Sequence, residues 1–305
     1  MTGTGGLRLG TRGSALALAQ TQLVAAALAA RGVEVEIVTI KTTGDTAARD
    51  ASWPLARGAF VTELERALAA DAIDLAVHSA KDLPTDASPG VEIVAYPVRA
   101  DPRDALVSRS GAALEALPEG ARVGTESPRR RAFLLHRRGD LEIVPIHGNV
   151  DSRLRQLDAG ACDALVLAAA GLDRLGLADR IVERLAPAVM LSAVGQGALA
   201  IQLRAGDPRR EVVGALDHAP TRAAVEAERA FLRGMGGGCR APFAALATVE
   251  GPSLGLDAAA LEPDGGELIR ERLVGTIAEP AALGDRAAER LLSRGAGRLA
   301  SEVRA

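Results

Sequence analysis

Strand-like and helix-like segments alternate from the first residues of this chain, and this rhythm restricts the fold more than any other feature. Residues 7–12 read as a short strand, and a helical run capped by Ser14 follows and ends at Gly32. Residues 33–41 alternate apolar and polar side chains and are rich in β-branched residues, which predicts a second strand. We therefore expect a mainly parallel sheet that is covered by helices.

The rhythm continues and then repeats in a second block. A helix at 60–70 and strands at 73–79 and 91–98 complete the first block. After the turn-rich residues 99–105, the second block predicts strands at 105–109, 141–146 and 163–171, and helices at 127–138 and from Asp151 onward. The two blocks therefore predict two similar α/β domains.

The pattern of predicted helices and strands changes in the last third of the chain. Residues 190–204 carry glycines on both sides of Gln196 and are expected to return the chain to the first domain. A helix from about residue 220, three strand-like segments and a C-terminal helix indicate a small α+β domain. We predict three domains, namely 1–98 with 198–216, 99–197, and 217–305.

Composition excludes several classes of function. The chain of 305 residues is 48% hydrophobic and 25% charged, which is typical of a globular protein with a real core. Aromatic residues make up only 2%, so stacking on nucleic-acid bases is not expected. The net charge of −3 gives no general attraction to nucleic acid or to an anionic membrane. The sequence shows no signal peptide and no run of about 20 apolar residues, so we expect a cytoplasmic protein whose thiols are reduced.

Three arginine-bearing segments lie where a predicted strand gives way to a helix. They contain Arg12 and Ser14, then Thr125, Ser127, Arg129 and Arg130, and finally Asn149, Ser152 and Arg153. Helix N-termini favour anions, and arginine grips carboxylates through two parallel hydrogen bonds. Together they predict a ligand with several negative groups. For Arg131, Arg137 and Arg138 we favour a simpler interpretation, a solvated basic helix face.

The stretch HSAKDLP follows a predicted buried strand, so it lies where ligands bind in open α/β sheets. Its lysine, Lys81, is one of two in a chain with 34 arginines, which suggests that this position needs a compact point charge. Asp82 should be ionised beside Lys81. A carboxylate among arginines suits chemistry with a cationic intermediate, but a loop ion pair between Asp82 and Lys81 explains the sequence equally well.

The two cysteines are expected to differ in role and not to form a disulfide. Cys162 lies in an apolar segment and is interpreted as structural. Cys239 follows three consecutive glycines, and a thiol on such a tether suits covalent attachment of a group. No histidine lies close to it in sequence, and no spacing of Cys and His predicts a metal site.

These stretches together resemble the porphobilinogen deaminase (hydroxymethylbilane synthase) family. The motifs run nearly end to end and include RLGTRGSALALAQ, DLAVHSAKDLPT, DPRDALVS, GNVDSRL, AVGQGALAIQ and GGGCRAP. The resemblance implies two periplasmic-binding-protein-like α/β domains with a hinge and a cleft, plus a small α+β domain. It also implies a dipyrromethane cofactor, held by a thioether, onto which four porphobilinogen units are condensed with loss of ammonia. Hydrolysis then gives hydroxymethylbilane for tetrapyrrole and heme biosynthesis.

The resemblance assigns roles to individual residues. Asp82 is the catalytic residue that stabilises a cationic azafulvene, and Cys239 is the cofactor tether. The residues implied in cofactor binding are Ser79, Lys81, Asp82, Thr125, Ser127, Arg129 and Arg130. Those implied in binding porphobilinogen or the growing chain are Arg12, Ser14, Arg153, Arg174, Gln196 and His147. We expect no metal, no nucleic-acid or membrane partner, and a monomer.

Two positions depart from the family's usual pattern. His147 stands where an arginine is usual, which removes a fixed positive charge, and Glu126 stands where a serine is usual, which adds a negative one. The alternatives from other classes are a non-catalytic solute-binding protein and a ligand-sensing regulator. A regulator would need a helix-turn-helix, which we do not find. A binding protein would have the mass of its sequence alone, whereas a deaminase would carry two extra pyrrole units.

Overall fold

The structure is a computed structural model that describes residues 6–40, 61–86, 88–236 and 241–301. Its strands form three sheets, and the chain divides into two compact units. The first unit comprises Met1–Arg99 and Ala198–Arg222, and the second comprises Ala100–Gly197 and Ala223–Ala305. The predicted division into three domains stays a prediction. No helix in the described ranges is both long enough and apolar enough to cross a membrane.

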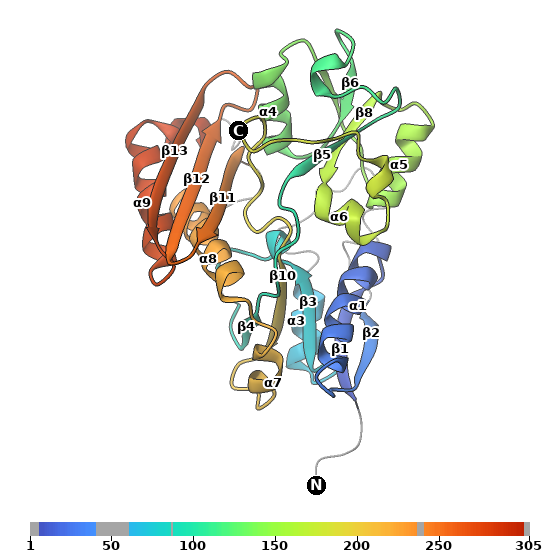
Figure 1. The fold of residues 1–305 in the computed structure, drawn as a ribbon, viewed down its shortest axis with the longest axis vertical. Coiled ribbons are helices and arrows are strands. Elements are labelled where there is room, and N and C mark those ends of the chain that lie inside the picture. The colour runs from blue at the N-terminus through green and yellow to red at the C-terminus, as the bar shows by residue number, and fades with distance from the viewer. Residues whose placement is uncertain (1–5, 41–60, 87, 237–240, 302–305) are drawn as a thin grey trace. The chain divides into compact units, whose positions relative to one another are not determined.

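The first unit contains a five-stranded sheet whose order is β2-β1-β3-β10-β4 (Figure 1). Its strands are β1 (Leu7–Arg12), β2 (Val35–Ile40), β3 (Leu75–Ser79), β4 (Val91–Ala95) and β10 (Leu199–Arg204). β1 pairs in parallel with β2 and β3, whereas β10 is antiparallel to both of its neighbours. The predicted return of the chain to the first sheet is therefore confirmed, and the sheet is mainly parallel as expected.

Helices cover both faces of this sheet because successive side chains of a strand point to opposite sides. Leu75 and Val77 of β3 join one core, and Ala76 between them joins another. The first core includes side chains of α1, and the second includes side chains of α3. The helices of this unit are α1 (Ala15–Ala29), α3 (Thr62–Ala69) and α7 (Arg210–Gly214), with a 3₁₀ turn η1 (Ala80–Asp82) after β3.

The second unit contains a sheet built on the same plan, with the order β7-β6-β8-β5-β9. Its strands are β5 (Asp104–Ser108), β6 (Arg122–Gly124), β7 (Glu142–Val144), β8 (Ala164–Ala168) and β9 (Glu183–Arg184). β6 pairs in parallel with β7 and β8, and β5 is antiparallel to β8. In each sheet, therefore, three parallel strands are followed in spatial order by an antiparallel strand, which comes late in the chain in the first sheet (β10) and first in the second (β5).

The helices of this part are α4 (Pro128–Arg137), α5 (Val150–Asp158) and α6 (Ala169–Arg174), with 3₁₀ turns η2 (Leu114–Ala116) and η3 (Ala178–Arg180). The strand predicted at 163–171 is wrong at its end, because the chain turns into α6 at Ala169. A continuous apolar run does not distinguish a buried strand from a helix, and consecutive alanines favour the helix. The short β6 lay outside the predicted strands.

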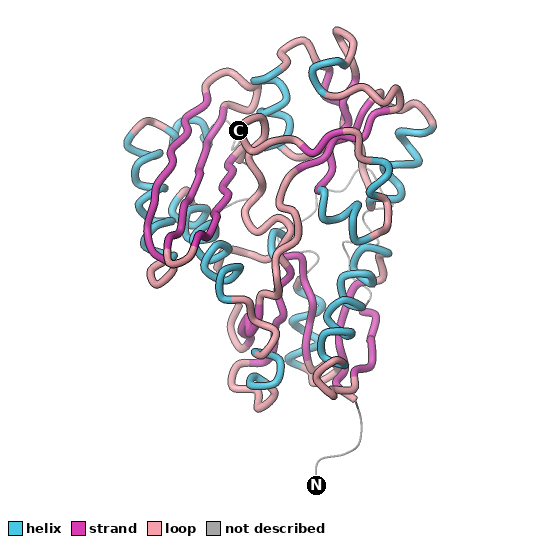
Figure 2. Tube along the Cα trace, viewed as in Figure 1, coloured by secondary structure: helices cyan, strands magenta, loops and turns pink. Residues whose placement is uncertain are grey.

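The third sheet is an antiparallel meander of β11 (Phe243–Glu250), β12 (Ser253–Leu261) and β13 (Leu268–Thr276). The remaining helices are α8 (Ala219–Gly234), α9 (Pro280–Ser293) and α10 (Ala296–Ser301). Figure 2 shows the three long strands of the meander beside these helices. Alternate side chains of β11 enter different cores, with Ala245 and Ala247 packed in one and Ala244 and Leu246 in the other. This sheet is therefore buried on both faces, and the α/β plus α+β fold class is confirmed.

Candidate anion-binding and catalytic site

In the first unit, several predicted site residues lie at one edge of the sheet. Arg12 ends β1 and Ser79 ends β3, and these parallel strands are neighbours, so both residues lie at the same edge. Ser14 caps α1 as predicted, because its Oγ accepts a hydrogen bond from Ala17 N at 3.3 Å. Gln20 of α1 donates to Ser79 Oγ at 3.0 Å. The structure thus brings Arg12, Ser14 and Ser79 to one sheet edge.

The histidine of HSAKDLP belongs to the core beneath this edge. His78 Nε2 lies 3.0 Å from Gln202 Oε1 on β10, and the amide of Gln202 donates to Glu65 at 2.9 Å. Since that amide nitrogen is a donor to Glu65, its oxygen accepts from a protonated Nε2. Burial, together with the charge of Arg12, lowers the pKa of His78 to about 4. His78 is therefore a neutral structural donor.

Lys81 and Asp82 lie in the 3₁₀ turn that follows β3. The turn is fixed to the residue before β10, because Ala80 N donates to Ala198 O at 3.0 Å. Lys81 is half-buried and Asp82 is exposed. Asp82 therefore presents a carboxylate to solvent just beyond the carboxyl end of β3, where ligands of open α/β sheets bind.

In the second unit, Arg129 and Arg130 are buried around a single carboxylate. Arg129 Nη1 lies 2.7 Å from Asp104 Oδ2, and Arg130 Nε lies 2.9 Å from Asp104 Oδ1. The side chain of Gln196 also donates to Asp104, at 3.1 Å. Arg129 and Arg130 reach the carbonyl oxygens of Leu191 and Val166 as well. We call Asp104, Arg129, Arg130 and Gln196 the buried arginine cluster.

The cluster carries a net positive charge. Two guanidinium groups and one carboxylate leave +1, and Asp104 has no exposed surface. Burial alone would raise the pKa of Asp104, but the charges of Arg129 and Arg130 outweigh it and hold that pKa well below its usual range. Burial lowers the pKa of Arg130. A net positive charge favours binding of an anion. The two arginines are nearly buried, since only 4% of Arg129 and 7% of Arg130 is exposed to solvent.

The remaining predicted residues of this unit lie beside the cluster. Ser127 caps α4 and accepts from Arg130 N at 3.4 Å, while the buried Thr125 accepts from Ser127 N at 3.2 Å. Arg174 donates to Gly197 O at 2.7 Å, directly after Gln196. Thr125, Ser127 and Arg174 thus lie next to members of the buried arginine cluster, and their predicted roles in binding stay predictions.

The two residues that depart from the family's usual pattern contact each other. His147 Nδ1 lies 2.5 Å from Glu126 Oε1, and an Nη of Arg153 lies 3.6 Å from Glu126 Oε2. Burial lowers the pKa of Arg153, and the charge of Glu126 opposes that shift. The Glu126 carboxylate thus lies between the Arg153 guanidinium and the His147 imidazole, both of which the resemblance assigns to substrate binding.

One surface interpretation was wrong. Arg131 and Arg137 are exposed as expected. The side chain of Arg138, however, is only 15% exposed and donates to the carbonyls of Leu114 and Leu117, at 2.9 and 3.1 Å. It holds the η2 turn against the end of α4, so its guanidinium replaces backbone partners that the turn lacks.

The structure describes one of the two cysteines, Cys162. Cys162 is buried with a free thiol, and burial raises its pKa, which agrees with a structural role. Cys239 lies outside the described residues, in the connection between α8 and β11. Its predicted role as the tether stays a prediction.

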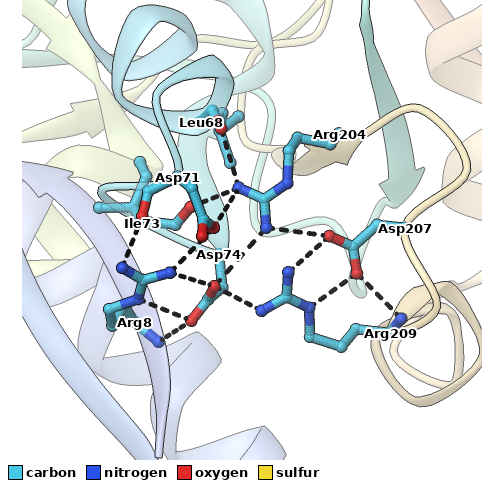
Figure 3. Close-up of polar contacts among 8 residues, drawn as sticks. All are labelled: Arg8, Leu68, Asp71, Ile73, Asp74, Arg204, Asp207 and Arg209. Carbon is cyan, nitrogen blue, oxygen red and sulfur yellow. Dashed lines mark hydrogen bonds and ion pairs between the residues drawn. The ribbon is translucent and has the colours of Figure 1, made fainter.

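The sequence analysis missed a second set of buried charges, shown in Figure 3. Asp74 precedes β3 and accepts from Arg8 of β1 at 3.1 and 2.8 Å, and it also pairs with Arg209. Arg204 and Asp207 extend the network. Because Arg8 and Asp74 lie at the amino ends of parallel strands, this edge is opposite to Arg12 and Ser79. We interpret the network as structural.

Asp104 is the functional residue that sequence reasoning missed. The only local signal was an aspartate at the beginning of a predicted buried strand, since a buried acid requires a partner. Its partners lie 25, 26 and 92 residues away, so no local spacing identifies them.

The strand order and these side chains first define a class, namely an α/β protein whose two five-stranded sheets share one plan and which buries two arginines on one carboxylate. The chain belongs to the porphobilinogen deaminase family. The family model "Porphobilinogen deaminase, dipyromethane cofactor binding domain" matches residues 7–211, and the model of the C-terminal domain matches residues 222–293.

Curated relatives agree over nearly the whole chain. It is 49% identical over 300 residues to the porphobilinogen deaminase of Syntrophotalea carbinolica, which covers 96% of this chain and 94% of the relative. It is 50% identical to that of Desulforudis audaxviator, with 97% of each chain covered. Among solved structures, a periplasmic substrate-binding protein of an ABC transporter from Coxiella burnetii is 18% identical, covers 69% of this chain and 91% of its own, and has a TM-score of 0.44. We assign the fold from the order and direction of the strands in the sheets, and not from this similarity.

Proposed function

We propose that this chain is a working porphobilinogen deaminase that condenses porphobilinogen stepwise onto a dipyrromethane primer, releases ammonia, and yields hydroxymethylbilane. The observation that carries the proposal is the exposed carboxylate of Asp82 at the sheet edge that also holds Arg12 and Ser79. A solute-binding protein for a carboxylate ligand needs cations there, and an exposed carboxylate would repel its ligand.

The described residues suit a cofactor with carboxylate side chains. The buried arginine cluster has one more positive charge than negative, and its guanidinium groups are held rigidly by Asp104 and by backbone carbonyls. Ser127 and the amino end of α4 add hydrogen-bond donors. We assign cofactor binding to Ser79, Lys81, Thr125, Ser127, Arg129 and Arg130, and the thioether to Cys239. When bound, the dipyrromethane supplies the pyrrole carbon that receives the first substrate.

We assign substrate binding to the remaining predicted residues, which are Arg12, Ser14, His147, Arg153, Arg174 and Gln196. Arg153 and Arg174 are anchored by backbone carbonyls, so their guanidinium groups are oriented before a ligand arrives. Gln196 is buried and donates to Asp104, so it acts on substrate through the arginine cluster. Porphobilinogen carries an acetate and a propionate group, which match these cations.

Asp82 acts on the reacting centre. Loss of ammonia from the aminomethyl carbon of porphobilinogen leaves positive charge on the pyrrole, and a fixed carboxylate stabilises it. The same oxygen atoms can hold the proton of a pyrrole nitrogen. The backbone of the turn that carries Asp82 is held by the bond from Ala80 N to Ala198 O, so the position of Asp82 along the chain is fixed before substrate binds.

The test combines activity and mass. Purified protein incubated with porphobilinogen should release ammonia and form a linear tetrapyrrole that cyclises and absorbs in the visible range. Its intact mass should exceed the sequence mass by two pyrrole units. A protein of unmodified mass that binds porphobilinogen without turnover would instead be a solute-binding protein.

We also propose that the protein is a cytoplasmic monomer without a nucleic-acid partner. The low aromatic content and the net charge of −3 support the last point. Light scattering after size exclusion tests the oligomeric state, and cell fractionation tests the location.

A further inference from the structure

The segment between β6 and α4 places a carboxylate against two side chains that we assign to the substrate. Glu126 lies 2.5 Å from His147 Nδ1 and 3.6 Å from Arg153, through a different oxygen in each case. The side chains of Glu126 and His147 are 37% and 43% exposed, so the carboxylate is accessible to solvent. The longer distance exceeds a hydrogen bond, so Arg153 is paired electrostatically and loosely.

Hydrogen bonds made by side chains of α5 hold the Arg153 guanidinium and the backbone of His147 independently of this carboxylate. Arg153 Nε donates to Gly148 O at 2.7 Å, and Gln156 Nε2 donates to His147 O at 2.9 Å. Gly148 has a φ of 100°, and a Cβ there would lie 2.9 Å from Ser152 Oγ. The turn is therefore packed closely against α5, and the donors remain in place when the carboxylate leaves.

The other charged groups around this site have partners of their own. Arg130 on α4 is influenced by the charge of Arg153, but Asp104 pairs with it. On α5 itself, Asp151 pairs with Arg155 at 3.1 Å. Within the part of the chain that the structure describes, Arg153 forms its recorded ion pair with Glu126, in the segment between β6 and α4.

We propose that Glu126 is an internal competitor of the substrate carboxylate, which occupies Arg153 and His147 in the empty site and is displaced when an acetate or propionate group binds. The inference rests on the proposed function, since that assigns Arg153 to the substrate. A ligand must break the internal pair before it gains its own, so Glu126 weakens substrate binding. It does not touch the reacting carbon, so the chemical step is unaffected.

The opposite role makes the opposite prediction. If Glu126 served to position Arg153, its removal would loosen the guanidinium and weaken substrate binding. The direction of the change in KM therefore separates a competitor from a positioning residue.

The first test is steady-state kinetics of the holoenzyme with porphobilinogen. Glu126→Gln keeps the shape of the side chain and removes its charge, and we expect KM to fall about two- to fivefold, the range of an exposed ion pair, with kcat unchanged. Glu126→Ser should act in the same direction. The matched control is Glu115→Gln, because Glu115 forms an exposed pair with Arg137 at 2.6 Å and should leave KM unchanged. An unchanged or raised KM in both Glu126 variants overturns the inference.

The second test needs no substrate. Phenylglyoxal modifies accessible arginines, and peptide mass spectrometry can follow Arg153 and Arg155 separately. In Glu126→Gln, Arg153 should react several times faster while Arg155, paired with Asp151, should react at the wild-type rate. Equal rates at Arg153 in both proteins overturn the inference. A wild-type protein that cannot turn over porphobilinogen overturns the proposed function instead, and Arg153 reactivity then decides the internal pairing alone.

Discussion

Replacing Asp104 by asparagine tests the buried arginine cluster most directly. Every side-chain group recorded around Asp104 is a donor, from Arg129 at 2.7 Å, Arg130 at 2.9 Å and Gln196 at 3.1 Å. An asparagine offers one oxygen and one NH2 group in the same space. If its oxygen accepts from Arg130 and Gln196, its NH2 group faces the donor of Arg129.

The expected cost follows from burial and charge. Asp104 is completely buried, and its removal changes the cluster from +1 to +2, because among the described residues it is the carboxylate that pairs with both guanidinium groups. Breaking a buried ion pair by removing one partner costs about 3–5 kcal/mol. For a unit of this size, about 2–4 °C is lost per kcal/mol, so Tm should fall by roughly 6–20 °C.

Urea and thermal unfolding of purified protein at pH 7 measure this loss of free energy. The matched control is Asp158→Asn, because Asp158 pairs with Arg180 at 2.6 Å while both side chains are well exposed. That variant should lose at most about 1 kcal/mol. Equal losses in the two variants would refute the reasoning, since they would mean that burial adds nothing to the requirement for a counter-charge.

The remaining predictions concern chemistry and acid stability. Cys239→Ser should fold but carry no covalent pyrrole adduct by intact mass, because oxygen does not replace the thioether; an adduct that persists assigns the tether elsewhere. Asp82→Asn should lower kcat by about 10²–10³ and leave the adduct in place, and a near-normal rate would exclude charge stabilisation. Lys81→Arg should lower kcat/KM more than Arg131→Lys on the exposed face of α4, and equal effects would mean that a point charge is not required. Burial alone would raise the pKa of Asp74, but hydrogen bonds from Arg8 and Arg209 hold it well below its usual range. The Asp74 carboxylate therefore stabilises the fold above about pH 4, and this stabilisation is lost as the pH falls further. The destabilisation of Asp74→Asn, measured by urea unfolding, should accordingly be full at pH 7 and shrink below pH 4; a constant difference would contradict it.

Local sequence signals were sufficient for much of the fold. Ser14 was predicted to cap a helix and Ser127 to lie at the start of one, because a serine stands before each helical run, and both cap their helices. The return of the chain to the first domain was expected from residues 190–204, and β10 makes that return, although its antiparallel direction was not predicted. These features depend on neighbours in sequence, which is why they could be predicted.

The partners of the charged side chains could not be predicted in the same way. Arg129 and Arg138 both belong to an arginine-rich helix, but one reaches Asp104 and the other reaches loop carbonyls. The pairing of Glu126 with His147 joins segments that follow different strands. Periodicity reports which face of an element is buried, but it does not report which charge lies opposite.

The two internal carboxylates differ in burial, and under the proposed function this difference separates their roles. A guanidinium that is to recognise a carboxylate in fixed geometry has to be partly buried, and a buried cation needs a counter-charge. Asp104 supplies that charge permanently, since it is shared by two arginines and fully enclosed. Glu126 supplies it at an exposed position, where a ligand can take its place. Burial thus decides which carboxylate is part of the scaffold and which one the substrate can displace.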